Sequence, residues 1–195
     1  MINEFVDEDG RPIPIIFRLW HEMEDSWAWW CPGSDNVSKA DYITFYQLTV
    51  NKIRSKCPDA QILFGYGPDR YLTNYGETSY LTYYPGDSYV DILGYDDYWI
   101  ARTDKTSSAL SIALENARTV SKVAAKKGKP AVLFETNNDL DATVDVFFSD
   151  YVQPMLKDSE VSLSVFQIWS AFAGTSAKAA AFEEFKKQDN IIFDH

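Results

Sequence analysis

Basic residues, histidine and cysteine are scarce in this sequence of 195 residues, and each scarcity excludes a class of function. The chain holds 18 lysines and arginines against 29 aspartates and glutamates, a formal net charge of −11. Nucleic-acid binding needs clustered basic side chains, so this balance argues against it. Two histidines and two cysteines are too few for a multi-histidine metal site or a disulfide framework. We expect Cys31 and Cys57 to be free thiols, with a single bridge between them as the alternative.

Long hydrophobic runs are absent as well. No apolar stretch approaches the roughly 20 residues that span a bilayer, so we expect no membrane attachment. The acidic start, MINEFVDEDG, lacks the positively charged segment and following apolar segment of a signal peptide. With 46% hydrophobic and 24% charged residues, the chain has the composition of a folded protein. We therefore expect a single domain over residues 1–195.

Aromatic residues, by contrast, are abundant. Phe, Trp and Tyr make up 15% of the chain, and four of the six tryptophans fall within eleven positions: Trp20, Trp27, Trp29 and Trp30. A protein core uses tryptophan sparingly because the indole N–H needs a partner. The cluster therefore indicates a flat stacking surface, of the kind that sugar rings or bases need, and the acidic charge favours sugars.

Short β-rich runs alternate with longer helical stretches along the chain. Strands are predicted at 14–20, 61–66, 90–93, 131–134 and 161–169, and helices at 39–56, 106–127, 142–157 and 177–188. This alternation predicts a parallel sheet with right-handed crossovers. The carboxyl ends of parallel strands meet at the edge that carries the chemistry, and polar and aromatic residues follow the predicted strands there, among them His21, Glu22, Asp96, Tyr98, Glu135 and Trp169.

Two glutamates stand out at this edge. Glu22 follows the first strand, and Glu135 ends the apolar run 131–134. Two carboxyl groups that converge on one cavity suit glycoside hydrolysis, in which one protonates the leaving oxygen and the other attacks the sugar across about 5 Å. Trp20 and Trp27 would supply the apolar surroundings that raise the pKa of the acid. The alternative is that each glutamate merely caps the loop after its strand.

Three segments, in order, strengthen the first interpretation. They are PIPIIFRLWHEMEDSWAWWCPG, YYPGDSYVDILGYDDY and AVLFETN. The first resembles the segment P-v-x-x-R-x-x-H-E-M-N-G-x-W-F-W-W-G of glycoside hydrolase family 26, whose members include β-mannanases. The second is similar to that family's Y-P-G-D-x-Y-V-D-x-x-G-x-D-x-Y block, and the third stands where the family has its strand-ending nucleophile motif. The resemblance covers about residues 9–169.

The resemblance implies a role for each matching residue. Glu22 would be the general acid/base and Glu135 the nucleophile of a retaining mechanism, which needs no cofactor. Arg18 would lie beneath Glu135 as its charge partner, with an ion pair of the barrel interior as the alternative. His21 would hydrogen-bond the sugar or orient a glutamate.

Four further residues match positions that serve substrate binding in the family. Trp27 would stack on a sugar near the cleavage point, and Trp169 would form the floor beneath the reacting sugar. Asp96 would contact substrate, and Tyr98 would contact the nucleophile. For Trp29 and Trp30, not part of this set, packing within the loop is the alternative to a sugar contact.

Several positions depart from the family pattern. Glu24 and Asp25 replace the family's Asn-Gly pair and add two negative charges beside the predicted acid. Like charges raise carboxyl pKa values, so these two either raise the pKa of Glu22 or face solvent. Ser170 follows Trp169 where relatives carry arginine, and Asn137 stands in place of a glycine.

Length is the largest departure, because a (β/α)8 TIM barrel typically needs about 250 residues. The acid/base motif belongs to the family's fourth strand, so the resemblance implies an α/β fold of five parallel strands, units four to eight of the barrel. The chain would be the C-terminal portion of a catalytic domain, with two exposed sheet edges. Open edges favour association, with another copy or with a complementary N-terminal fragment.

The implied activity is endo-hydrolysis of β-1,4-mannosidic bonds in mannan-type polysaccharides. The alternatives are a remnant that binds β-linked oligosaccharides without cleaving them, and a fragment with no function of its own. Relatives are usually exported, which implies a secreted or cell-surface protein although no signal peptide is visible.

Overall fold

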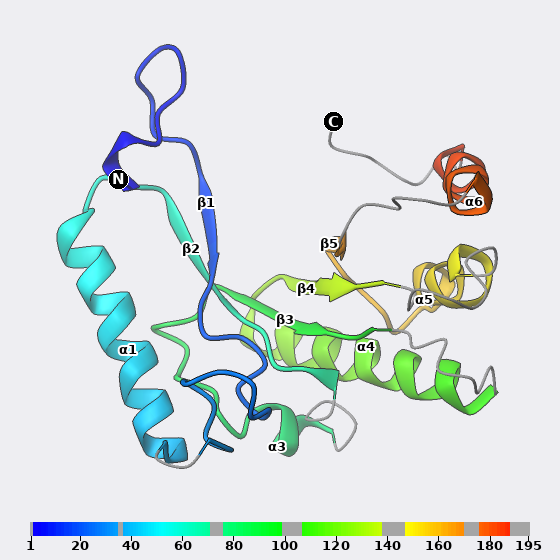
Figure 1. The fold of residues 1–195 in the computed structure, drawn as a ribbon, viewed down its shortest axis with the longest axis horizontal. Helices are drawn as coiled ribbons and strands as arrows, with labels where there is room; N and C mark the ends of the chain where they lie inside the picture. Colours follow the sequence, from blue (N-terminus) through cyan, green and yellow to red (C-terminus); the bar gives the residue numbers. More distant parts are fainter. Residues whose placement is uncertain are drawn as a thin grey trace.

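Five short strands pair in sequence order to form one parallel sheet. The computed structural model describes residues 2–34, 37–70, 76–98, 107–137, 147–169 and 176–187. Within them the order is β1-β2-β3-β4-β5, and every neighbouring pair is parallel. The strands are β1 (Ile15–Arg18), β2 (Ile62–Tyr66), β3 (Ile92–Asp96), β4 (Ala131–Thr136) and β5 (Val165–Ile168) (Figure 1). The predicted parallel sheet is confirmed.

Two strand ends differ from the sequence prediction in a way that matters for the site. β3 continues past Leu93 to Asp96, and β4 continues past Phe134 to Thr136. The reason is continued pairing, since Asp96 lies opposite Glu135 across the two strands. Both carboxyl side chains therefore project from strands and not from the loops after them.

Helices follow the strands, as predicted. They are α1 (Lys39–Lys56), α3 (Glu77–Tyr80), α4 (Ser107–Lys127), α5 (Gln153–Lys157) and α6 (Ser176–Lys186), with a 3-10 turn η1 (Ile2–Glu4) and a π-helical turn η2 (Phe147–Val152). The short helix α3, which was not predicted, lies between β2 and β3. The predicted helix 142–157 is η2 followed by α5; its first residues, 142–146, lie outside the described part. Among the described helices, none combines the length and apolar character that a bilayer crossing demands.

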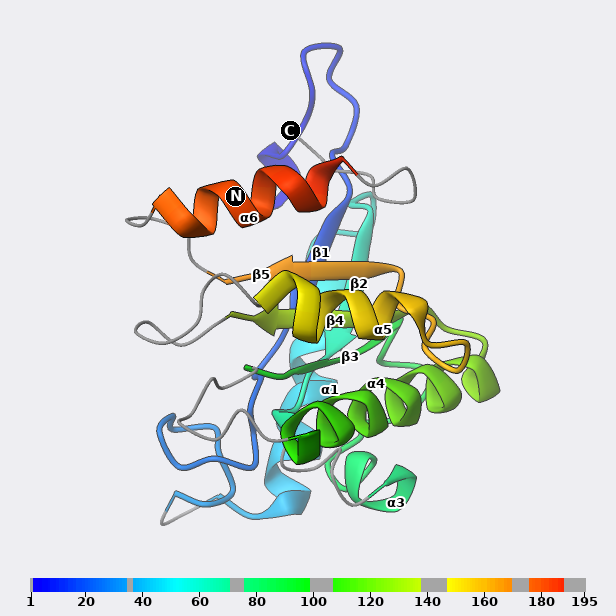
Figure 2. The ribbon, with the colours of Figure 1, turned by 90° about the vertical axis from the view of Figure 1, so that its right-hand side faces the viewer.

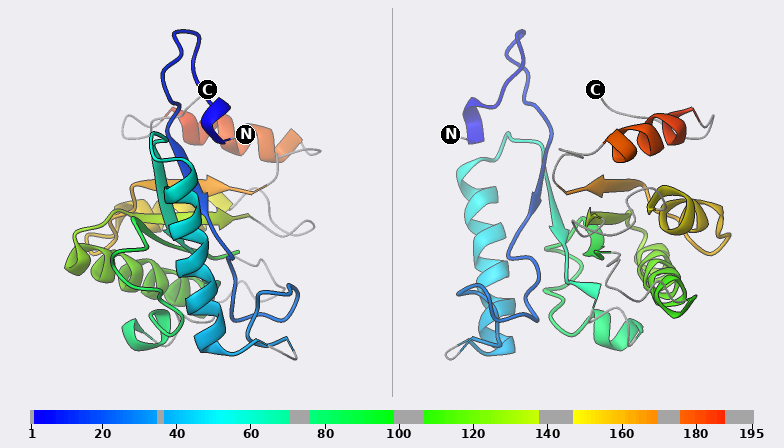
Figure 3. Two further views of the ribbon diagram at one scale, coloured as in Figure 1. Left: turned by 90° about the vertical axis from the view of Figure 1, so that its left-hand side faces the viewer. Right: turned by 45° about the vertical axis from the view of Figure 1, so that its right-hand side comes forward.

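The two long helices, α1 and α4, are bounded by residues that commonly start or stop helices. α1 begins with a capping box, in which the Ser38 hydroxyl accepts from the Asp41 amide and the Asp41 carboxylate accepts from the Ser38 amide. α4 ends at Lys127, and the φ of 64° at Gly128, the next residue, suits glycine just past the end of a helix. α1 and α4 lie along the outside of the curved sheet (Figures 1 and 3), so strands and helices together form half a barrel.

The main core lies between the sheet and the helices and is rich in tyrosine. Tyr42 and Tyr46 of α1 are buried one turn apart, and each phenol donates to a main-chain carbonyl, of Trp20 (3.0 Å) and of Gly65 (2.9 Å) respectively. Buried tyrosines need such partners for their hydroxyl groups. The polar ends of these side chains therefore tie α1 to the segments at the sheet.

The inner face of the sheet is built differently, with one large side chain over glycines. The ring of Phe134 lies so close to Gly65, Gly67 and Gly94 that a Cβ atom at Gly94 would come within 2.3 Å of it. The guanidinium of Arg18 lies 5.5 Å from the centre of the same ring. Phe134 therefore supports Arg18 from the barrel interior, in the layer beneath the strand ends.

The two edge strands of the sheet, β1 and β5, each have one unpaired edge among the described residues. The parallel strands β4 and β5 point in the same direction (Figure 2). Among the described residues, β1 pairs only with β2, and β5 only with β4. Large apolar side chains of the strands are exposed, including Ile16, Leu63 and Val165. The expectation of an open sheet is confirmed, whereas association through its edges stays a prediction. Both cysteines are free thiols, as expected.

Candidate active site

Arg18, the last residue of β1, joins the carboxyl ends of β3 and β4. Its Nη1 donates to Oδ1 of Asp96, and its Nη2 donates to Oε1 of Glu135. The three side chains are only 15%, 0% and 12% exposed. Burial raises the pKa of Asp96 well above its ordinary value, and Arg18 opposes this effect. One guanidinium thus compensates two acidic side chains in a largely dry environment.

The carboxyl groups of Glu22 and Glu135 face each other at this edge. One oxygen each of Glu22, Asp96 and Glu135 lies within 4.8 Å of the others. That separation is near the roughly 5–5.5 Å of retaining glycosidases and well below the roughly 6.5–9.5 Å of inverting ones. The same three carboxyl groups have the spacing of cation ligands. The Arg18 guanidinium already supplies a positive charge to two of them, Asp96 and Glu135.

Glu22 has the surroundings of a general acid. Desolvation raises its pKa above the ordinary value, and the charges of Glu135 and Asp25 raise it further, while Arg18 lowers it. The indole Nε1 of Trp27 donates to Oε2 of Glu22 at 3.1 Å. The group is therefore biased toward the protonated form that a general acid needs.

The two acidic residues beside Glu22, Glu24 and Asp25, have different surroundings in the structure. Asp25 contributes to the raised pKa of Glu22. Glu24 instead turns both carboxylate oxygens into the protein, and burial raises its own pKa to about 8. The alternative that both side chains face solvent is therefore wrong for Glu24.

Both oxygens of Glu135 accept hydrogen bonds. Arg18 donates to Oε1, and the Tyr98 hydroxyl donates to Oε2 at 2.6 Å. Donors on both oxygens are the environment that a nucleophilic carboxylate requires. Burial and, after it, this contact raise the pKa of Tyr98, which keeps its hydroxyl proton available for donation.

His21 lies between the glutamates and the tryptophan cluster. Its ring centre is 5.4 Å from that of Trp27 and 6.0 Å from that of Trp30. Burial, followed by the charge of Arg18, lowers the pKa of His21 to about 4. The imidazole is thus neutral near pH 7, with one nitrogen to donate and one to accept.

Two of the predicted sugar platforms are open to solvent. Trp27 is 55% exposed and Trp169 is 52% exposed. Trp169 follows β5, and its amide donates to the carbonyl of Thr136 at 2.8 Å, beside Glu135. Both rings therefore lie exposed on segments that lead to the glutamates.

Asp96 is buried in the structure. Its side chain has no exposed surface and contacts Arg18. The contact with substrate that the resemblance implies for this residue stays a prediction. Because β3 extends through residue 96, the carboxyl points into the layer that holds Arg18.

The main chain around Glu22 is strained, which sequence reasoning did not foresee. Trp20 and Glu22 both have φ of 50°, and they are the only described residues other than glycine with positive φ. Such conformations cost on the order of 1–3 kcal/mol each and cluster at functional sites. The tryptophans marked the segment in the sequence, but nothing there marked its backbone.

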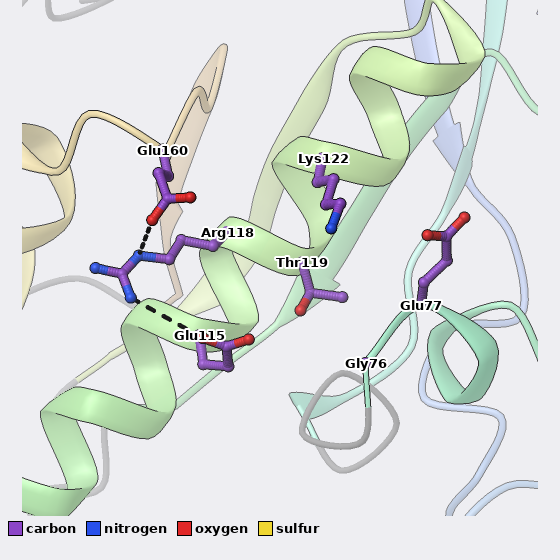
Figure 4. A pocket seen from close by; sticks show the side chains of 7 residues that line it. All are labelled: Gly76, Glu77, Glu115, Arg118, Thr119, Lys122 and Glu160. Atoms are coloured by element: carbon purple, nitrogen blue, oxygen red, sulfur yellow. Dashed lines mark ion pairs between the residues drawn. The ribbon is translucent and has the colours of Figure 1, made fainter.

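A separate cavity of about 500 Å³ lies beside α3 and α4, away from these residues (Figure 4). Arg118 there forms ion pairs with Glu115 and Glu160, shown as dashed lines, and with Asp158. The cavity is lined by Gly76, Glu77, Glu115, Arg118, Thr119, Lys122 and Glu160. None of the predicted site residues belongs to it.

Comparison with known proteins gives consistent matches. The family described as glycosyl hydrolase family 26 matches residues 1–173. The mannan endo-1,4-beta-mannosidase of Bifidobacterium adolescentis is 32% identical over an alignment of 191 positions that covers 93% of this chain and 19% of that protein.

Solved structures agree with these sequence matches. GH26C from a Muricauda species superposes with a TM-score of 0.85 at 27% identity, covering 98% of this chain and 53% of that one. The catalytic domain of an endo-beta-1,4-mannanase from a Bacillus species gives 0.83 at 26% identity, covering 96% and 54%. The chain thus spans about half the length of these structures and about a fifth of the mannosidase.

Proposed function

This chain belongs to glycosyl hydrolase family 26, and on that premise we propose that it acts as a retaining endo-hydrolase of β-1,4-mannosidic bonds in mannan-type polysaccharides. The observation that carries the proposal is the approach of the Glu22 and Glu135 carboxyl oxygens to within 4.8 Å. That spacing suits direct attack by a carboxylate and leaves no room for a water between the groups. The choice of mannan rests on what the named relatives cleave.

In the proposed reaction, Glu135 attacks the anomeric carbon while Glu22 gives its proton to the leaving oxygen. The bond from C1 to that oxygen breaks as the bond from C1 to Glu135 forms. The Glu22 carboxylate then takes a proton from water, the water oxygen bonds to C1, and Glu135 leaves. The raised pKa of Glu22 supports the first step, and donors on both Glu135 oxygens support the attack.

The remaining residues take supporting roles. Trp27 and Trp169 offer exposed rings on which the C–H faces of sugars stack. Neutral His21 hydrogen-bonds a sugar hydroxyl. Tyr98 and Arg18 orient Glu135, and Arg18 is itself held on its other side by the buried aspartate of β3. The open edges of β1 and β5 suit pairing with another copy or with a complementary segment.

The test uses purified chain with mannotetraose and galactomannan, and measures released reducing ends. Wild type should cleave, Glu135→Ala should lower the rate by at least 1,000-fold, and Glu22→Gln by at least 100-fold, in line with the loss of a nucleophile or a general acid. Glu160→Gln, on the surface at 73% exposure, serves as the control and should leave the rate unchanged.

Two results would count against the proposal. Absence of turnover by wild type at high protein concentration removes the hydrolase function from the chain. If proton NMR shows that the α-anomer is the first product, the mechanism is not retaining, although the chain is still a hydrolase. If turnover is absent but calorimetry detects mannooligosaccharides, and Trp169→Ala removes that binding while Glu22→Gln spares it, the chain is a binding module.

A further inference from the structure

Three consecutive carbonyl groups in the Glu22 segment each accept a hydrogen bond from a side chain. The Tyr42 hydroxyl donates to the carbonyl of Trp20 at 3.0 Å, and Trp30 Nε1 donates to that of His21 at 2.9 Å. The Cys31 thiol donates to the carbonyl of Glu22 at 3.5 Å. Past Arg18 the segment lies outside β1, and its Glu22 amide donates to the carbonyl of Gly67, just after β2, at 3.0 Å.

These contacts coincide with the strained backbone. Trp20 and Glu22, with φ of 50°, lie on either side of His21. A left-handed conformation in a residue other than glycine persists only where its surroundings enforce it. The side chain of Glu22 leaves the main chain in a direction that these two torsions set, so whatever holds them also places the carboxyl group.

Tyr42 differs from the other two donors in its origin. Trp30 and Cys31 belong to the loop that directly follows the segment, whereas Tyr42 lies on α1, 22 positions away from its acceptor. Its side chain is buried, and the capping box at Ser38 and Asp41 holds the helix end from which it projects. Tyr42 therefore connects the strained segment to a regular element.

We propose that Tyr42 is a positioning residue for Glu22, acting through the carbonyl of Trp20 and supported by Trp30 on the next carbonyl. That Glu22 is a catalytic acid rests on the proposed function, but the effect of Tyr42 on the position of Glu22 can be measured without any activity. Removing the hydroxyl leaves the carbonyl without its donor and lets the left-handed turn relax. The Glu22 carboxyl then moves from its buried place.

The position of Glu22 has a signature that can be measured. Its charged neighbours come from several elements, namely Arg18 of β1, Asp69 after β2, Asp96 of β3, Glu135 of β4, and Asp25 of its own loop. Desolvation is the largest cause of its raised pKa, followed by Glu135. A carboxyl that moves outward loses both influences, so its pKa falls toward that of an ordinary glutamate.

Tyr46 provides a matched control. It lies one turn further along α1, is equally buried, and donates to the carbonyl of Gly65 at 2.9 Å. Tyr46→Phe deletes the same atom from the same helix but leaves the donors to the Trp20, His21 and Glu22 carbonyls in place. A role for tyrosine hydroxyls in stability alone would move both variants alike.

The experiment compares wild type, Tyr42→Phe and Tyr46→Phe by titrating carbon-13 labelled glutamate side chains in NMR spectra, with Glu22→Gln to assign the Glu22 signal. We expect the midpoint of Glu22 to fall by at least half a pH unit in Tyr42→Phe and to stay unchanged in Tyr46→Phe. On mannotetraose, kcat should fall about tenfold in Tyr42→Phe alone, with KM within twofold of wild type.

The outcomes separate the two proposals. Equal Glu22 midpoints in the two tyrosine variants overturn the positioning role, whether or not wild type cleaves mannan. A selective fall in the Glu22 midpoint without turnover by wild type supports the positioning role and counts against the hydrolase function. If Tyr42→Phe does not fold, Trp30→Phe, which keeps a ring but removes the donor to His21, must lower the midpoint instead.

Discussion

Arg18 offers the sharpest test of how the site is held together. Arg18→Met removes the guanidinium but keeps an unbranched apolar chain over Phe134, whose ring centre lies 5.5 Å from the arginine. Asp96 and Glu135 then remain as neighbouring, nearly buried carboxyl groups without their cation. Breaking a buried ion pair from one side typically costs about 3–5 kcal/mol, because the remaining charge is left uncompensated.

This cost converts into a clear thermal shift. For a chain of this size, 1 kcal/mol corresponds to about 2–4 °C in Tm, so Arg18→Met should melt roughly 6–20 °C below wild type at pH 8. The deficit should shrink toward pH 5. The pKa of Asp96 is raised by burial, and losing Arg18 raises it further, so at lower pH a proton neutralises the carboxyl in the arginine's place.

The measurement is unfolding followed by circular dichroism at pH 5 and pH 8, with Arg54→Met as the control. Arg54 is 46% exposed and lies 3.9 Å from Asp91, and an exposed pair contributes at most about 1 kcal/mol. If Arg18→Met loses no more stability than Arg54→Met, or if its Tm lies equally far below that of wild type at both pH values, Arg18 does not compensate the buried carboxyl groups.

Three further predictions address other parts of the molecule. Glu24→Gln should stabilise the protein at pH 8 by on the order of 1–3 kcal/mol and change its stability little at pH 4. Folding raises the pKa of the Glu24 carboxyl from 4.5 to about 8, so the folded wild type loses stability as the pH rises between these two values. Gly94→Ala should destabilise by about 3 kcal/mol in urea unfolding, since the new Cβ meets Phe134 at 2.3 Å. Trp27→Phe removes the donor to Glu22, so kcat should fall about tenfold and the alkaline limb of the pH profile should move upward, because a donor favours the charged carboxylate.

Each of these has its own contrary result. A Glu24→Gln variant whose stability tracks wild type from pH 4 to pH 8 would mean that this carboxyl is charged in the folded protein. Unchanged stability of Gly94→Ala would show that the Phe134 ring moves aside freely. A downward move of the alkaline limb in Trp27→Phe would assign the tryptophan a role in burying Glu22 and not in donating to it.

Local pattern alone determined most of the architecture. The apolar runs located all five strands, though not their exact ends, and helix signals placed α1 and α4 almost to their ends, because capping residues, Gly128 and periodicity act over a few positions. The order of strands was implied only by the resemblance to units four to eight of a barrel, since long crossovers also allow other parallel orders. The pairing of Glu22 with Glu135 at one sheet edge was predictable, because carboxyl ends of parallel strands meet there.

Tertiary structure decided the directions of individual side chains. Asp96 turned inward to Arg18, and Glu24 turned into the protein, whereas the sequence left open whether Glu24 raises the pKa of Glu22 or faces solvent. The hydrogen bond from the Tyr42 hydroxyl to the Trp20 carbonyl could not be predicted from the sequence pattern either. Periodicity reports which face of an element is apolar, whereas these directions depend on single torsions and on partners distant in the chain, which form only when the sheet and α1 have packed.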